Sequence, residues 1–396
     1  MSAPDLSRTT GSPLGWSVRL SLFYAAIFLV AGVSMPWFPV YLQSRGLSAD
    51  QIGLILAIGF WVKPLANPVG SRWADLSGER RRPLIVFLIG AGAAYALFAA
   101  GDAFWAFFLA AVLASCFNSP ILPLADNLTM TAAAERNLDY GRVRLWGSVT
   151  FIGAVYAAGW LLEGAAPSII LWLMVGGYWL TAIVAANLPD IRFPKPQFRR
   201  RNPFALIGHP VFALFLLASG LNSAAHAVLY GFGSIHWRAV GLDDVQIGIL
   251  WAIGVVAEIV LFWLSRRIVG RTGPLRLMLA GCAAGLLRWT LTAGAEDFAG
   301  LALLQVLHAL TFGAAHLGAM HFIQRAAPEG MSATAQGLFS AFGMGLFMGF
   351  GALAAGFLYD GLGGSAYYVM AIVSAVSTLA ALLLIRRWDG SRLTLG

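Results

Sequence analysis

Two stretches of this chain, half its length apart, share most of their sequence. Residues 46–59 read GLSADQIGLILAIG, and residues 241–254 read GLDDVQIGILWAIG. Each copy carries the chain from one apolar segment through a short polar turn into the next. The duplication predicts two halves of similar structure, and duplicated membrane proteins commonly work by moving such halves around a site between them.

The composition is that of a membrane protein. Of the 396 residues, 59% are hydrophobic and 11% are charged, against about 25% charged in a typical soluble domain. A helix needs roughly 20 apolar residues to cross a bilayer. We therefore predict an all-α membrane protein with twelve transmembrane helices, at residues 17–42, 49–73, 83–101, 103–130, 139–162, 167–188, 209–236, 244–269, 274–294, 298–324, 333–358 and 364–387. The first segment has no small-residue cleavage site after a short apolar core, so we expect it to be retained.

Basic residues gather on one side of these segments. With the N-terminus in the cytoplasm, the loops on that side contain Arg80, Arg81, Arg82, Arg192, Lys195, Arg199, Arg200, Arg201, Arg266, Arg267, Arg271, Arg276, Arg386 and Arg387. The opposite loops contain only Arg45 and Arg238. Because cytoplasmic loops are rich in Lys and Arg, both termini are predicted to be cytoplasmic. This orientation signal accounts for the net charge of +8, and we expect no nucleic-acid partner.

The one long polar connection, residues 191–208, is rich in Pro and Arg. It is predicted to be a cytoplasmic linker between two six-helix bundles, residues 1–190 and 209–396. The sequence contains no zinc-ligand spacing, phosphate-binding loop or nucleophile elbow. We therefore expect no enzyme activity, no cofactor and no bound metal.

The loop after the second segment resembles a motif of the major facilitator superfamily. Residues 73–81 read WADLSGERR, and the superfamily pattern is G-x-x-x-D-R-x-G-R-R. Asp75, Arg80 and Arg81 fit this pattern, whereas Leu76 replaces its first basic residue. The resemblance implies a gate in which Asp75 pairs with an arginine or a helix end. A simple charge at a helix end is the alternative.

Further motifs resemble the phenylpropionate permease family, a relative of the lactose permease type of sugar/proton symporter. They are NSPILPLAD at 118–126, LDYGRVRLWGS at 138–148, HAVLYGFGSIHW at 226–237, GVVAEIVLF at 254–262, LRW at 287–289, LHALTF at 307–312 and HLGAM at 316–320. The resemblance covers the whole chain. It implies the fold of the superfamily and proton-coupled import of small organic acids.

Ionisable side chains within membrane segments are costly and are usually functional. Lys63 lies in the second segment, and the offset between the two repeats relates it to Glu258 in the eighth. We predict that both side chains face a central cavity, where Lys63 contributes to substrate binding. The alternative is that either residue only joins two helices through a buried hydrogen bond.

Arg142 and Arg144 open the fifth segment and point about 200° apart, so only one of them can face the cavity. In the sugar symporters the cavity arginine pairs with an acid of the preceding helix, and the matching residues here are Arg144 and Asp126. The resemblance implies that Arg144 binds a substrate carboxylate, since a guanidinium makes bidentate hydrogen bonds to such a group. A permanent ion pair with Asp126 is the alternative.

Several aromatic and histidine side chains of the second half are candidates for the same site. His226 and Tyr230 are four residues apart and share a helix face, while His308 and His316 deviate by about 80° and can share only a broad one. The tryptophans next to the polar motifs could stack an aromatic substrate. They are Trp146, Trp237 and Trp289.

The second half also resembles the proton-handling part of the sugar symporters. Arg288 and His308 match its arginine and histidine, but Thr311 stands where those symporters have a carboxylate. Glu258 is therefore expected to carry the proton. His308 and His316 are rival carriers, because histidine titrates near neutral pH.

Taken together, the residues predict a proton-coupled symporter of a small organic anion, with an aromatic carboxylate as one option, that works by alternating access. We expect a monomer in the cytoplasmic membrane of a bacterium, whose partners are a small-molecule substrate, protons and the lipid bilayer. The alternatives within transport are a sugar or nucleoside symporter and a proton antiporter that exports drugs or sugars. A non-transporting membrane receptor is the alternative of a different class.

Overall fold

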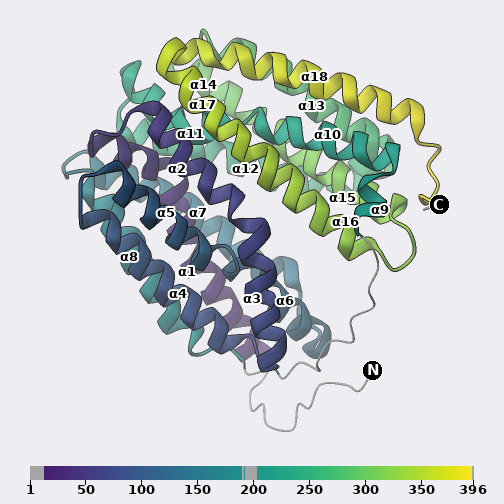
Figure 1. Ribbon diagram of the computed structural model, residues 1–396, viewed down its shortest axis with the longest axis horizontal. Coiled ribbons are helices and arrows are strands. Elements are labelled where there is room, and N and C mark those ends of the chain that lie inside the picture. Colours follow the sequence, from purple (N-terminus) through teal and green to yellow (C-terminus); the bar gives the residue numbers. More distant parts are fainter. Residues whose placement is uncertain (1–12, 190, 192–202, 395–396) are drawn as a thin grey trace. The chain divides into compact units, whose positions relative to one another are not determined.

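The computed structural model describes residues 13–189, 191 and 203–394, and within these ranges every regular element is a helix (Figure 1). Among the described residues, ten helical runs are long and apolar enough to cross a membrane, by length and composition. The last of them, Ser332–Arg387, has 56 residues and contains both final predicted spans. The predicted span 274–294 coincides with α13 (Pro274–Thr292), which is not among the ten. The all-helical fold is confirmed, and the number of twelve spans stays a prediction.

The chain divides into two compact units. Unit 1 takes in Met1–Leu47 and Trp61–Phe198. Its helices are α1 (Pro13–Ser44), α3 (Lys63–Ser77), α4 (Arg81–Ala96), η1 (Leu97–Ala99), α5 (Phe104–Asn118), α6 (Ile121–Arg136), α7 (Tyr140–Leu162) and α8 (Ser168–Ala185). Helix α1 packs along α7 and α8, and α4 packs on α5 and α8. The core between them includes Trp16, Tyr24, Leu88, Ala125 and Tyr178.

Unit 2 takes in Ser48–Phe60 and Arg199–Gly396. Its helices are α2 (Ala49–Trp61), α9 (Pro203–Ile207), α10 (Pro210–Ala224), α11 (Ala227–Ala239), α12 (Asp244–Thr272), α13, α14 (Phe298–Val306), η2 (Ala309–Ala314), α15 (Ala315–Ala326), α16 (Ser332–Phe339), η3 (Ser340–Phe347), α17 (Met348–Leu362), η4 (Gly363–Ser365) and α18 (Ala366–Arg387). Helix α18 packs on α10 and α13, and α13 packs on α15 (Figure 1). The elements η2 and η3 are π-helical, and a turn of a π-helix is wider than a turn of an α-helix.

Most of the predicted linker 191–208 lies outside the described residues, and its last part contains α9. The predicted bundles 1–190 and 209–396 stay predictions. The two compact units differ from them within the first half of the chain, where the segment Ser48–Phe60 belongs to unit 2. This segment belongs to unit 2 because α2 lies against α17. A Cβ atom added to Gly53 would stand 2.8 Å from the Cα atom of Gly356. Only glycine permits two backbones to approach so closely.

The repeated sequence forms the same helix start twice. Gly46 and Gly241 open the two copies with φ of 80° and 95°, a left-handed conformation that glycine adopts without strain. In the second copy Asp243 accepts a hydrogen bond from the backbone of Gln246, whose side chain accepts one in return. Ser48 donates its backbone N–H to Gln51 in the first copy. The repeat is therefore a helix-capping motif that starts α2 and α12.

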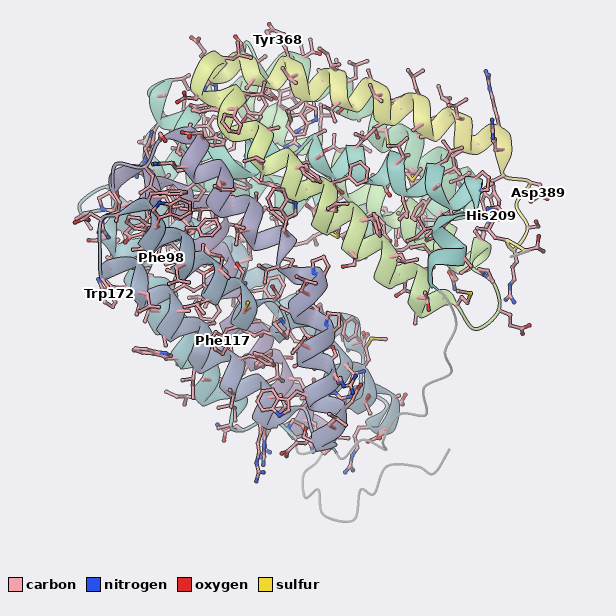
Figure 2. All side chains as sticks on the ribbon, viewed as in Figure 1. Phe98, Phe117, Trp172, His209, Tyr368 and Asp389 are labelled. Carbon is pink, nitrogen blue, oxygen red and sulfur yellow. The ribbon has the colours of Figure 1, made fainter. Side chains whose placement is uncertain are left out.

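Large apolar side chains cover the outside of the helices as well as the inside. Trp172 of α8 and Tyr368 of α18 are 53% and 49% exposed (Figure 2). Trp105, Trp160 and Trp263 are exposed as well. Monomeric soluble proteins rarely expose apolar surface on this scale, so these side chains fit a lipid environment.

Candidate functional site

A buried network of polar side chains lies inside unit 2, centred on Arg288 of α13. The guanidinium donates to Thr311 Oγ1 at 2.8 Å, to His308 Nδ1 at 3.0 Å and to the side-chain oxygen of Gln305. His308 Nε2 lies 2.7 Å from Glu258 Oε1 of α12. Arg288 is 1% exposed. A buried charge needs such partners, because taking it from water without them is costly.

The chemistry of the partners fixes the direction of each hydrogen bond in this network. A guanidinium only donates, so His308 accepts at Nδ1, keeps its proton on Nε2 and donates it to Glu258. The backbone carbonyl of Asn222 only accepts, so His226 donates from Nδ1 at 2.9 Å. His226 Nε2 then accepts from the Thr311 hydroxyl at 3.1 Å, since a second cation beside the Arg288 guanidinium would be repelled. Both histidines are therefore neutral, and His308 cannot gain a proton without losing Arg288.

The π-helical segment η2 places three rings of this region in a row. His308, Phe312 and His316 stack with ring centroids 5.4 Å and 5.8 Å apart and planes within 11° and 3°. The sequence predicted a deviation of about 80° between the two histidines on a regular α-helix. The wider π turn removes much of that deviation, because each residue then rotates less about the axis. Asn222 of α10 donates to the carbonyl of Thr311 at 2.9 Å and so ties the segment to α10.

The aromatic candidates of unit 2 surround the network rather than line an open site. Trp289 is 1% exposed and stacks on Tyr367. The guanidinium carbon of Arg288 lies 4.5 Å from the centroid of the Trp289 ring. In this conformation Arg288 and Tyr367 lie against the Trp289 ring, and its stacking on a substrate stays a prediction. Trp237 is equally buried. His226 and Tyr230 stack at 5.5 Å, and Tyr230 is only partly buried.

Unit 1 holds a second polar cluster around Asp126 of α6. Its Oδ1 accepts hydrogen bonds from the hydroxyls of Tyr24 at 2.5 Å and Tyr140 at 3.2 Å. No ion pair joins Asp126 to Arg144 within the described residues, so the expected pair is absent from this conformation. Instead, the two tyrosines donate to Oδ1 of Asp126, and the Arg144 guanidinium lies over aromatic rings.

Arg144 of α7 is positioned by those rings. Its guanidinium carbon lies 4.1 Å from the ring centroid of Phe28 and 5.2 Å from that of Tyr24. Arg144 is half-buried, and its guanidinium donates no hydrogen bond to any of the described residues. Stacking uses the face of a guanidinium and leaves the N–H edge available. Trp146, two residues further on, is 54% exposed.

Lys63 and the loop residues of the gate motif also belong to unit 1. Lys63 is the first residue of α3, directly before Pro64, and is half-buried. Asp75 forms an ion pair with Arg80 at 2.5 Å, and Arg80 also donates to Asn127 of α6 at 2.9 Å. Burial lowers the pKa of Arg80, and Asp75 opposes that change. Arg81 donates to the carbonyl of Leu188 instead.

Sequence reasoning missed several members of these clusters. Gln305 stands three residues before His308, and Asn222 stands four before His226; Thr311, three after His308, was noted only for lacking a carboxylate. This spacing puts them on the same helix faces as the histidines and would have revealed them. Tyr24 could not have been found in this way, because the chain places it far from Asp126.

Comparison with known protein families gives one match to a family model. The model is described as MFS_1 like family, and it covers residues 17–370 of this chain. A match of this length spans both units.

Two proteins of known sequence resemble the chain over nearly its whole length. The probable 3-phenylpropionic acid transporter of Escherichia coli (strain K12) is 32% identical over 363 residues, which cover 90% of this chain and 94% of that protein. The maltose permease of Geobacillus stearothermophilus is 30% identical over 376 residues, covering 92% and 94%. Among solved structures, the nucleoside transporter NupG matches with a TM-score of 0.81 at 18% identity, covering 94% of this chain and 100% of that chain.

Proposed function

Since the chain belongs to the MFS_1 like family of membrane transporters, we propose that it carries a small carboxylate and a proton together across the membrane. It works by alternating access, as a monomer in the cytoplasmic membrane of a bacterium, with both termini in the cytoplasm. The observation that carries this proposal is the contact of Glu258 with His308, which in turn holds Arg288.

The charges of unit 2 favour movement of an anion and a proton in the same direction. With both histidines neutral, Arg288 and Glu258 cancel each other. Protonation of Glu258 leaves the positive charge of Arg288 uncompensated, and an anion then binds more favourably because opposite charges attract strongly in a medium of low dielectric. A proton and an anion that bind together fit a symporter. In an antiporter, by contrast, the proton and the substrate would compete.

Unit 1 supplies the group that recognises the carboxylate. Arg144 offers the N–H edge of a guanidinium already oriented by Phe28 and Tyr24. Such a group binds a carboxylate through two parallel hydrogen bonds. Because Asp126 already accepts hydrogen bonds from two tyrosines, we expect the site to bind substrates that do not hydrogen-bond to this carboxylate. Lys63 adds a further positive charge to the unit. The positive charges of Arg144 and Lys63 repel other cations, which disfavours export of cationic drugs.

A second candidate is import of a sugar. It is favoured by the similarity to the maltose permease and by the polar cluster of Asp126, Tyr24 and Tyr140, whose oxygens could bind sugar hydroxyls. The two candidates differ in Arg144, because a sugar has no carboxylate for a guanidinium to bind.

The experiment is uptake into liposomes that contain the purified full chain. Radiolabelled 3-phenylpropionate, maltose and a nucleoside are each tested with and without an inward proton gradient, against protein-free liposomes. The proposal expects 3-phenylpropionate uptake above the protein-free rate, faster with the gradient. Maltose uptake alone would support the second candidate, and uptake of any substrate that ignores the gradient would refute proton coupling.

A further inference from the structure

Glu258 of α12 lies beside Gly313, which stands between His308 and His316 in the sequence. Its Cγ atom lies 3.7 Å from the position that a Cβ atom on Gly313 would occupy. Along the same helical run, His308 precedes Gly313 by about one turn and His316 follows it by about one turn. The same Cβ atom would stand 2.8 Å from Leu261 Cδ2, so the absent side chain of Gly313 lets Leu261 and Glu258 of α12 approach this turn between the two histidines.

The two histidines differ in what their ring nitrogens already bind. Both nitrogens of His308 are occupied, by Arg288 and by Glu258 itself. Neither nitrogen of His316 makes a hydrogen bond to any residue in the described part of the chain. Its ring is held only by stacking, on Phe312 and against Phe339. His316 is therefore the ring that can accept a proton without breaking an existing bond.

A small cavity lined by both polar and apolar side chains lies beside His316. Its volume is about 20 Å³, which is enough for one water molecule. Ser219, Asn222 and Ser223 line it from α10, and His316 lines it from α15. The other lining residues carry no charge, and the titratable group that faces His316 from a neighbouring helix is Glu258 of α12.

The cavity lies on one side of the Arg288 network. Its neighbours continue into a core cluster that contains Phe212, Leu275 and Phe322. These residues lie where α10 and α13 begin and where α15 approaches its end. With the orientation predicted from the basic loops, this is the cytoplasmic end of unit 2.

We propose that His316 and this cavity form the exit through which the transported proton leaves Glu258 for the cytoplasm, an inference that rests on the proposed symport. The O–H bond of the protonated carboxyl breaks as an N–H bond forms on His316, which gives a carboxylate and an imidazolium. The imidazolium then gives the proton to a water in the cavity and becomes neutral again. Glu258 returns to His308, and its negative charge again offsets the positive charge of Arg288.

The test uses the full chain in liposomes with 3-phenylpropionate as the probe and a pH-sensitive dye inside. His316→Gln keeps a polar side chain but cannot carry a proton, and His321→Gln on the same helix is the matched control, since His321 does not line the cavity. We expect His316→Gln to slow gradient-driven uptake and internal acidification by at least about tenfold, as expected for loss of a proton-transfer group. Exchange of labelled for unlabelled substrate should continue, because exchange needs no proton release.

A second variant protects the test against misfolding of the first. Ser223→Val leaves His316 intact and fills part of the cavity with a methyl group, so it should also slow net uptake more than exchange. Equal net uptake by His316→Gln and wild type would overturn the inference and leave the proposed symport standing. Loss of exchange together with net uptake would overturn it too, since His316 would then bind substrate. A wild type that moves no protons with 3-phenylpropionate would overturn the symport itself.

Discussion

Thr311 is the side chain whose removal tests the buried network most sharply. Its hydroxyl accepts from Arg288 and donates to His226, and the residue is 0% exposed. Thr311→Val keeps the volume and removes the hydroxyl. A hydrogen bond to a charged group contributes about 1.5–3 kcal/mol, and a neutral one between membrane helices about 0.6–1.7 kcal/mol. We therefore expect Thr311→Val to cost about 2–5 kcal/mol.

Thr311→Ser separates the hydrogen bonds from packing. It keeps the hydroxyl and loses one methyl group, which costs about 0.5–1.5 kcal/mol in a packed core. Serine should therefore be closer to wild type than valine, the reverse of the order that packing alone predicts. The assay is the apparent melting temperature and the unfolding rate of the purified protein in detergent, at a fixed scan rate because membrane proteins often unfold irreversibly.

Thr378→Val serves as the control. Thr378 donates only to the carbonyl of Ser374 in its own helix, so the substitution should change stability by about 0.5 kcal/mol or less. If Thr311→Val is as stable as Thr311→Ser, the hydroxyl does not join Arg288 to His226, and the assignment of a neutral His226 loses its basis.

Three further predictions concern substrate, proton and packing. Arg144→Lys should slow 3-phenylpropionate transport at least about tenfold, because Lys lacks the planar guanidinium fork. Arg142→Lys is the control and should not slow it, since the side chain of Arg142 is 87% exposed. Equal transport rates of the two variants would make Arg144 a structural residue. Glu258→Gln should reduce gradient-driven uptake to the protein-free rate and retain exchange, because Gln resembles the protonated acid; normal gradient-driven uptake would exclude Glu258 as carrier. Gly53→Ala should destabilise the protein by about 1–3 kcal/mol, because its methyl group would lie 2.8 Å from backbone atoms. Gly361→Ala is the control and should not destabilise the protein, since Gly361 has open space around it. Equal melting temperatures of the two variants would contradict the close approach of α2 and α17.

The fold was largely predictable because its signals are local. The repeated capping motif, the apolar segments and the family motifs all lie within short stretches of sequence, and the family match confirms the resemblance drawn from them. The neighbourhood of His226 and Tyr230 followed from helical spacing alone.

Other features depend on contacts that spacing cannot reveal. The ring row of His308, Phe312 and His316 needs a π-helical turn, which no pattern in the sequence announces. Asp126 bonds to Tyr24 from a distant helix, so the expected ion pair with Arg144 is replaced. Trp289 is covered by Arg288 and Tyr367, although its sequence position only showed that it adjoins a polar motif.

The central claim is that substrate and proton cross together, and proton flux measures it directly. Liposomes with the wild-type protein are placed in weakly buffered medium, 3-phenylpropionate is added outside, and external pH and labelled substrate uptake are recorded together. Protein-free liposomes supply the background, because the protonated acid crosses lipid unaided. The account predicts alkalinisation of the medium that begins with uptake, exceeds the background and is lost in Glu258→Gln. Protein-dependent uptake of 3-phenylpropionate with no change in external pH beyond the background would contradict it.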